Sequence, residues 1–397
     1  MALIVLISLL AMGALYFVLS ELETVIAYQR EARRAGSGGG SAFEQAREAL
    51  IAYAVTYRDN NSDQVFGFLP CPDTTGTGQE AASCGSSNQA AVGLLPYKSL
   101  GLPDLRDARG DCLWYAVSGS FKNSPKSSAN VMNWDTQGQF QVNDGSGAVL
   151  TQPGDALGGA AAVIFSPGGP LSGQARSMSA SGPCQVDPAL VSAYLDGSYD
   201  FATDVKITLT QGPKNDASGN PAVNDQLAWI TPKEIFDRVV ARKDFSNALA
   251  ATPPGQLNTL LNRIKAVFDK RIQDDIFNGT TTSRPSNFAS YVPKPSGIYT
   301  GELDPSMDIG VQAQASYANY LTHWAEQFRV GVCDSLSAPC LDINNGGTAN
   351  CRGALVLGGR MANGRPRAAA QKGSSLSILA NYFESGSSTG GLDVLTG

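Results

Sequence analysis

The stretch MALIVLISLLAMGALYFVLSELE, residues 1–23, opens the chain and bears most directly on its fold. Its first twenty residues carry no charged side chain, and the first acidic residue is Glu21. A helix rises about 1.5 Å per residue, so a helix of that length extends about 30 Å, which matches the hydrocarbon core of a bilayer. The stretch therefore predicts an apolar helix that can span a membrane.

Secretory signal peptides begin with basic residues and end in a cleavage site of small residues. Here nothing basic precedes Ala2, and the apolar run passes through Leu19 into Glu21. We therefore expect the segment to be retained, with a membrane anchor as its simplest role. The helix is expected to continue to about residue 35, because no proline interrupts it.

A second helix is predicted after a flexible hinge at Gly36–Ser41, GSGGGS, for which an engineered linker is an alternative origin. Ser41 is a suitable N-cap, with Glu44 at the capping-box position. Apolar residues then recur at helical spacing, so one face of this helix should dock on a folded domain. That face consists of Phe43, Ala46, Leu50, Tyr53, Ala54 and Tyr57.

The composition indicates a loop-rich, β-containing body. The 397 residues suffice for two or three domains, only 16% are charged, and there are 43 glycines and 21 prolines. The net charge of −6 argues against a general nucleic-acid surface. Seven cysteines without a C-x-x-C pair favour disulfides in an oxidising compartment, with one thiol left over or paired between chains.

Further elements follow from periodicity and capping signals. Residues 158–169 and 204–212 are predicted as strands, the first buried and the second alternating. Thr231 begins a helix, because Pro232 and Glu234 follow it at the first-turn and capping-box positions. Two more helices are expected over 255–276 and 317–328.

The order of these features resembles that of type IV pilin-like subunits, including the pseudopilins of type II secretion. The resemblance covers residues 1 to about 120. Residues 1–21 look like the mature start left by a prepilin peptidase. Three later stretches resemble the helix-to-sheet region and the Asp-x-x-Gly turn of pseudopilins: LIAYAVTYRD, GFLPCPDTTGTG and GLLPYKSLGLPDLRDARGDCLWYAVSG.

One position departs from that family. Pilins typically carry glutamate at the fifth mature position, where it offsets the terminal amine of a neighbouring subunit, but this chain has Val5. A buried, unpaired ammonium is costly, so Val5 is what we expect of a minor pilin at a filament tip. A homopolymer remains the alternative if the amine meets carbonyl groups or is methylated. The residues assigned to the polymerisation helix are Met1, Val5, Gly13 and Glu21.

The resemblance implies an α+β fold class: a long N-terminal apolar helix followed by a glycine-rich globular domain with an antiparallel sheet and inserted helices. The expected divisions are a transmembrane or filament-core helix at 1–35, the hinge at 36–41 and a pilin-like α+β domain at 42–225. A helical insertion and loop-rich region at 226–397 is expected to complete or extend that globular domain.

The implied function is that of a structural subunit of an extracellular type IV pilus-like filament, polymerising through its N-terminal helix. Its partners would be copies of itself, other pilins, the assembly machinery and the prepilin peptidase, but no nucleic acid. It would lie in the inner membrane of a bacterium before assembly and on the cell surface afterwards. The alternatives are a minor tip pilin acting in adhesion or secretion, and a membrane-anchored periplasmic enzyme or binding protein.

Catalytic motifs are poorly supported. His323 is the only histidine, and packing or a helix surface is its expected role. The single G-x-S-x-G match, GSSTG around Ser388, lies in a Gly/Ser-rich tail without the strand and helix that a nucleophile elbow needs. The sequence therefore predicts that the chain is not an enzyme.

Calcium is the ligand hypothesis, because oxygen-rich turns suit a hard cation. Turns of Asp and Asn without a metal are the more common role of such stretches. Related chains tend to have acids where Thr75 and Thr77 stand, which weakens the first stretch. The candidates in three stretches are Asp73, Thr75, Thr77 and Glu80; Asp216, Ser218, Asn220 and Asp225; and Asp342 and Asn344.

Disulfides are predicted at two places. Cys71 and Cys84 should close a small loop that has little apolar material of its own to hold it. A second bridge is expected among Cys333, Cys340 and Cys351, with the pairing left open.

Overall fold

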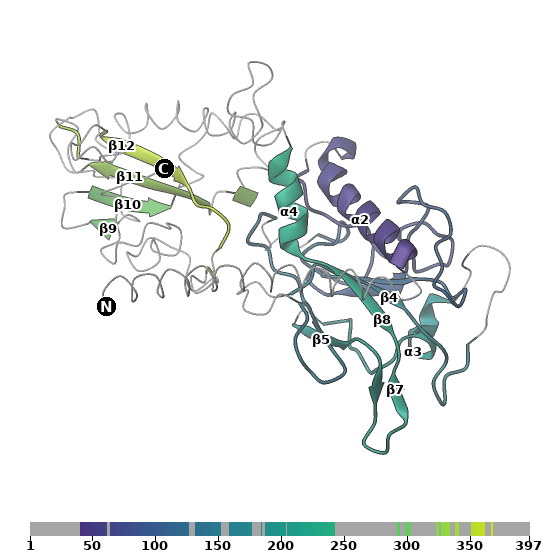
Figure 1. The fold of residues 1–397 in the computed structure, drawn as a ribbon. Coiled ribbons are helices and arrows are strands. Elements are labelled where there is room, and N and C mark those ends of the chain that lie inside the picture. The colour runs from purple at the N-terminus through teal and green to yellow at the C-terminus, as the bar shows by residue number, and fades with distance from the viewer. Residues whose placement is uncertain are drawn as a thin grey trace, which may run out of the picture.

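The structure, a computed structural model, describes part of the chain (Figure 1). The described residues are 40–61, 64–126, 132–151, 159–176, 184, 187–203, 205–242, 292–293, 298–302, 323–324, 327–333, 338–340, 351–361 and 367.

A four-stranded antiparallel sheet forms the centre of the larger described part. Its strand order is β1-β2-β4-β8. Every residue of the inner strands β2 and β4 is buried, as the apolar run at 158–169 predicts for β4. The strands are β1 (Ala91–Leu94), β2 (Trp114–Val117), β4 (Ala162–Ser166) and β8 (Gln226–Ile230).

Helix α2 (Gly40–Asn60) packs against this sheet beside helix α4 (Pro232–Ala241) (Figure 1). The two helices are tied by ion pairs, including Arg238 to Glu48 at 2.6 Å. The apolar face predicted for the second helix is buried except at Tyr53, which is half-buried. Gly40 and Ser41 are helical, so α2 reaches into the segment predicted as a hinge.

The start of α4 confirms the capping signals. The Thr231 hydroxyl accepts the Glu234 backbone N–H, and the Glu234 carboxylate accepts the Thr231 backbone N–H, which completes the capping box. Strand β8 pairs with β4 and leads directly into α4, so the described core includes residues on both sides of residue 225.

Smaller elements complete this part. Strand β3 (Phe140–Asn143) pairs in parallel with β5 (Ile207–Thr210), and the latter confirms the alternating strand. Strands β6 (Lys214–Asn215) and β7 (Pro221–Val223) form a hairpin. A 3-10 turn, η1 (Pro188–Leu190), precedes helix α3 (Val191–Tyr194).

A second antiparallel sheet lies later in the chain, with the order β12-β11-β10-β9. This sheet was not predicted from the sequence. Its strands are β9 (Val292–Pro293), β10 (Ile298–Glu302), β11 (Phe328–Cys333) and β12 (Gly353–Leu357).

The fold class predicted from the sequence needs correction. Residues 1–39, where the long apolar helix was expected, lie outside the described residues, as does the helix expected at 255–276. Among the helices that are described, none has the length and apolar composition needed to cross a bilayer. Only one face of α2 is buried, so its other face is polar and the helix carries Glu44, Arg47, Glu48, Arg58 and Asp59. The described fold consists of short helices and small sheets.

Three disulfides are present. Cys71–Cys84 confirms the predicted bridge, and Cys333–Cys340 settles the pairing left open among the last three cysteines. The bridge between Cys112 and Cys184 was not predicted, and its residues are 72 positions apart. Cys351 is a free, half-buried thiol.

Candidate functional site

The loop closed by the Cys71–Cys84 bridge is organised around the buried carboxylate of Asp73. One oxygen, Oδ1, accepts the backbone N–H groups of Thr75 and Gly76 at 2.8 and 2.9 Å and also the Thr75 hydroxyl at 3.0 Å. The other, Oδ2, accepts the Gly78 N–H at 2.5 Å. Both oxygens therefore stabilise the turn itself, the arrangement typical of aspartate in loops.

The other predicted ligands of this loop have different partners. The Thr75 and Thr77 hydroxyls contact each other at 2.8 Å. Glu80 accepts hydrogen bonds from the Tyr53 hydroxyl of α2 at 3.2 Å and from the Asn123 amide at 2.6 Å. Burial, followed by the negative charge of Glu80, raises the pKa of Tyr53 well above its usual value. Glu80 thus fastens the loop to α2.

The second predicted calcium stretch is an exposed hairpin turn. Asp216 Oδ1 accepts the backbone N–H groups of Ser218 and Asn220 at 2.8 and 2.9 Å. These bonds, led by that of Asn220, lower the pKa of Asp216. Asp225 is instead buried, and its carboxylate bonds the backbone of Asp196. The four predicted ligands are therefore divided between two environments.

Several predicted residues lie outside the described residues: Met1, Val5, Gly13, Glu21, Asp342, Asn344 and Ser388. Within the part of the chain that is described, no three His, Cys, Asp or Glu side chains gather in a way that could hold a metal ion.

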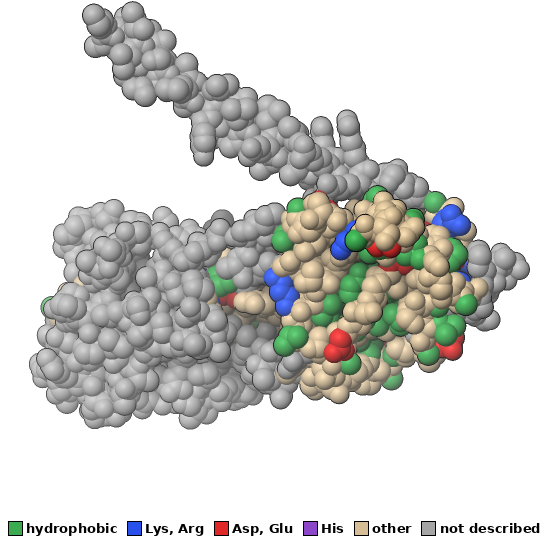
Figure 2. All heavy atoms as spheres, turned by 90° about the horizontal axis from the view of Figure 1, so that it is seen from below, with side chains coloured by type: hydrophobic (Ala, Val, Ile, Leu, Met, Phe, Trp, Pro, Cys, Tyr) green, Lys and Arg blue, Asp and Glu red, His purple; other side chains and the backbone are tan. Residues whose placement is uncertain are grey.

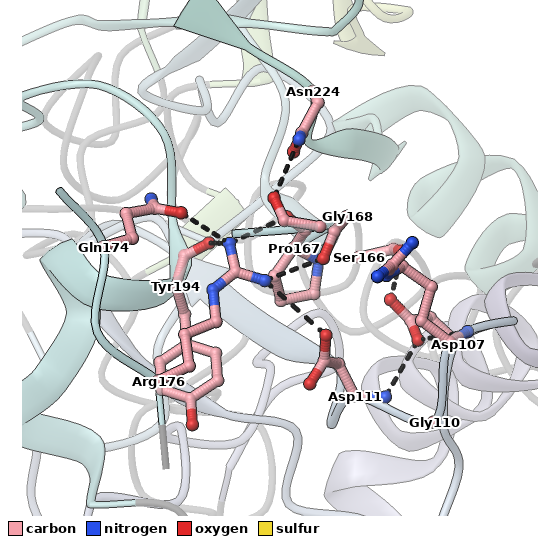
Figure 3. Close-up of polar contacts among 12 residues, drawn as sticks. Asp107, Gly110, Asp111, Ser166, Pro167, Gly168, Gln174, Arg176, Tyr194 and Asn224 are labelled. Carbon is pink, nitrogen blue, oxygen red and sulfur yellow. Dashed lines mark hydrogen bonds and ion pairs between the residues drawn. The ribbon is translucent and has the colours of Figure 1, made fainter. Parts of the chain in front are cut away.

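The most extensive polar centre was not predicted and surrounds Arg176 (Figure 3). Its buried guanidinium donates to the carbonyl oxygens of Ala193 at 2.8 Å, Gly168 at 2.7 Å and Tyr194 at 3.1 Å. It also donates to the Gln174 side chain at 2.8 Å and stacks over the Tyr194 ring, with its carbon 5.2 Å from the ring centroid. Protein acceptors thus occupy its donor groups.

An acidic turn lies on one side of this guanidinium (Figure 3). Asp111 faces Arg176 at 3.5 Å, while Asp107 accepts the Asp111 backbone N–H and the Ser166 hydroxyl, each at 2.9 Å. Burial, followed by the charge of Asp107, raises the pKa of Asp111. Asp107 and Gly110 belong to the Asp-x-x-Gly turn noted in the sequence, and the turn is fixed to β4 through Ser166.

Two more buried acids lie near this centre. Asp196 accepts hydrogen bonds from the Gln174 side chain and from the backbone N–H groups of Asn224 and Asp225. Asp225 accepts the Asp196 N–H at 2.7 Å through Oδ2, whereas its Oδ1 has no protein partner. Burial, followed by the charge of Asp196, raises the pKa of Asp225 to about 8.

His323 lies in a packed environment. Its Nδ1 accepts the backbone N–H of Met132 at 2.7 Å, so the proton of the neutral ring is on Nε2. Asn133 donates to the His323 carbonyl, and the next residue, Trp324, packs edge-on against Trp134 and Phe236. The contacts of His323 are those of a packing residue.

The arrangement around Arg176 can hold loops together, but it offers no free donor to a ligand. It joins segments from four places in the chain, and no motif in the sequence marks it. The Asp-x-x-Gly turn at Asp107–Gly110, which lies on one side of the guanidinium, was the only part of the arrangement that the sequence indicated. Sequence reasoning therefore found the loop carboxylates but missed the buried cation.

The visible face of the described body has few charged side chains. In Figure 2 the Lys and Arg side chains lie apart from one another among uncharged ones.

Comparison with protein-family models, with curated proteins and with solved structures finds no match for this chain.

Proposed function

We propose that this chain is a structural subunit of an extracellular type IV pilus-like filament. The observation that carries the proposal is the packing of α2 on an antiparallel sheet, in a chain whose preceding stretch, residues 1–20, has no charged side chain. The apolar face of α2 is already used within the body. The proposal assigns contact with lipid or with other subunits to residues 1–20, which carry no charged side chain.

The disulfides support a location outside the cytosol. Three disulfides join six of the seven cysteines, and disulfides persist in oxidising compartments. The hydrogen bonds around Arg176 also hold segments that lack regular secondary structure. A stapled body of this kind suits exposure on a cell surface.

The proposed partners are other copies of this chain, other pilins and the assembly machinery, reached from the inner membrane. The polymerising contact is assigned to the apolar segment at residues 1–20. Val5 favours a second candidate, a minor subunit at the filament tip, because the usual glutamate of repeating pilins is missing.

Imaging of sheared surface fibres tests the proposal. Antibodies raised against the chain should decorate fibres from producing cells along their length, and mass spectrometry of those fibres should identify it. Decoration at one end only would assign the tip role. Fibres without the protein, while it stays in the membrane fraction, would overturn both filament roles and favour a membrane-anchored enzyme or binding protein.

A matched pair of variants sharpens this test. Val18→Asp places a charge in the apolar segment and should prevent incorporation into fibres. Val205→Asp makes the same change at a side chain that is 63% exposed on the body, and it should assemble normally. Equal assembly of the two variants would contradict the role given to residues 1–20.

A further inference from the structure

Three cysteines lie together at the end of strands β11 and β12. Cys333 and Cys340 form a disulfide, and Cys351 is a free thiol. The backbone carbonyl of Cys351 accepts the Cys340 N–H at 3.1 Å and lies 3.7 Å from the Cys333 sulfur. The thiol therefore belongs to a residue that contacts both halves of the bridge.

The backbone contact brings Cys351 within bridging range of Cys340. Antiparallel residues that exchange both backbone hydrogen bonds have Cα atoms about 5.5 Å apart, and Cys340 and Cys351 are joined by one such bond. A disulfide needs a Cα separation of about 4.4 to 6.8 Å. Cys351 thus has a backbone position compatible with a bridge to Cys340.

Solvent access separates this bridge from the other two. Cys71, Cys84, Cys112 and Cys184 are all buried. Cys340 and Cys351 are half-buried, so solvent reaches both residues. Thiol–disulfide exchange requires a thiolate with access to a disulfide sulfur, and among the described bridges only Cys333–Cys340 has a free cysteine against it.

We propose that Cys333, Cys340 and Cys351 form an exchangeable three-cysteine site, in which one disulfide passes between two pairings. The Cys351 thiolate attacks Sγ of Cys340, so the Cys340–Cys351 bond forms as the Cys333–Cys340 bond breaks. The electron pair leaves on Cys333, which takes up a proton equivalent to the one lost from Cys351. One bridge and one thiol remain, and no oxidant is required.

The exchange changes the chemical character of the free thiol. In the described pairing the thiol is on half-buried Cys351, whereas after exchange it is on Cys333, which is only 1% exposed. The site thus switches between a thiol that solvent can reach and one that it cannot. This inference does not depend on the proposed filament role.

Disulfide mapping of the full chain tests the proposal. The protein, purified without reductant, is held at about pH 8.5, the ordinary pKa of a free cysteine. It is then trapped with N-ethylmaleimide and digested with pepsin in acid, where thiolates are absent. We expect peptides bridged Cys333–Cys340 and Cys340–Cys351 together. Complete labelling of Cys351, with Cys333–Cys340 as the sole bridge after prolonged incubation, would overturn the proposal.

Two variants serve as controls. Incubated with oxidised glutathione as the two-electron oxidant, Cys333→Ser should form the Cys340–Cys351 bridge and lose its reaction with maleimide, while two free thiols in that variant after this treatment would also contradict the proposal. Cys351→Ser should retain Cys333–Cys340 alone. The buried Cys71–Cys84 bridge should stay unchanged throughout, which excludes general scrambling during digestion.

Discussion

At Asp225, a carboxyl group is held in an environment that favours its protonated form. It is 1% exposed, lies against Asp196, and has a pKa raised to about 8 by burial and then by that neighbour. An unfolded aspartate has a pKa near 4. Between about pH 4 and pH 8 the folded chain therefore keeps a proton that the unfolded chain releases, so this group lowers the free energy of unfolding as the pH rises.

Asp225→Asn should remove this pH dependence, because the amide resembles the protonated acid. The gain in unfolding free energy over the parent chain should grow from pH 5 to pH 8 in urea denaturation. Asp196→Asn is the matched control. It loses an oxygen that accepts backbone N–H groups, so it should cost about 1–3 kcal/mol near pH 5. This cost should shrink towards pH 8, because the variant also removes the charge that helps to raise the pKa of Asp225. A constant difference between Asp225→Asn and the parent chain would refute the explanation.

His323 should titrate in the opposite direction. Burial, followed by the charge of Lys126, lowers its pKa to about 4, so the folded chain resists a proton that the unfolded chain accepts near pH 6.5. Stability from this group is present above pH 6.5 and is lost as the pH falls towards 4. As the only histidine, it has an imidazole NMR resonance that needs no further assignment. An apparent pKa near 6.5 would show that the ring is solvated.

The turn-forming aspartates could be predicted from the sequence, whereas the buried hydrogen-bond partners of Arg176 could not. Asp73 and Asp216 each serve the local turn that the sequence suggested. Arg176 donates hydrogen bonds to the carbonyl groups of residues 168, 193 and 194. Because these residues are not its neighbours in the sequence, the contacts cannot be predicted from a local pattern. A short-range pattern carries no information about such partners.

Helix α4 begins where the capping residues Thr231, Pro232 and Glu234 predict. Thr231→Ala should cost about 1 kcal/mol of unfolding free energy, because the Glu234 N–H loses its acceptor. Thr231→Ser keeps the hydroxyl and should lose much less. Urea denaturation compares the two variants. Equal losses would mean that the methyl group, rather than the capping bond, is responsible.

The Cys71–Cys84 disulfide is expected to stabilise the loop that it closes. Replacing both cysteines by serine should lower stability by about 3 kcal/mol, the loop-entropy estimate for a closure of this size. Thermal unfolding measures the loss. The same pair of changes should also free Asp73 to move, so proteolysis should cut between residues 71 and 84 first. Unchanged thermal stability and unchanged resistance to proteolysis would contradict the stabilising role of the disulfide.

Strands could be predicted only where the surrounding sequence has a clear pattern. Strand β4 lies in a continuous apolar run and β5 alternates buried and more exposed residues, whereas every residue of β2 is buried and β1 does not alternate. The parallel pairing of β3 with β5 joins residues more than sixty positions apart. The fold class failed for a related reason, since it was inferred from the first residues, while the described architecture rests on pairings far along the chain.

For the whole molecule, the described core has its own helix to cover the sheet. A chain truncated to begin at Gly40 should therefore be soluble and fold without detergent, because its apolar core closes between α2, α4 and the sheet. The full chain, with uncharged residues 1–20, should need detergent. Ultracentrifugation and circular dichroism compare the two. An insoluble or unfolded truncated chain would show that the core requires the removed residues.

Because α2 packs against α4, the apolar face of α2 cannot be fully covered until α4 has been synthesised. Arg47 and its partner Glu234 are 187 residues apart. At about 5 to 20 residues per second, a ribosome needs roughly 10 to 40 s to add that length. For most of that interval α2 has been synthesised but neither β8 nor α4 has, so the apolar face of α2 lacks its final cover. Synthesis itself therefore leaves a long window for chaperones and export factors to bind this helix before the body closes.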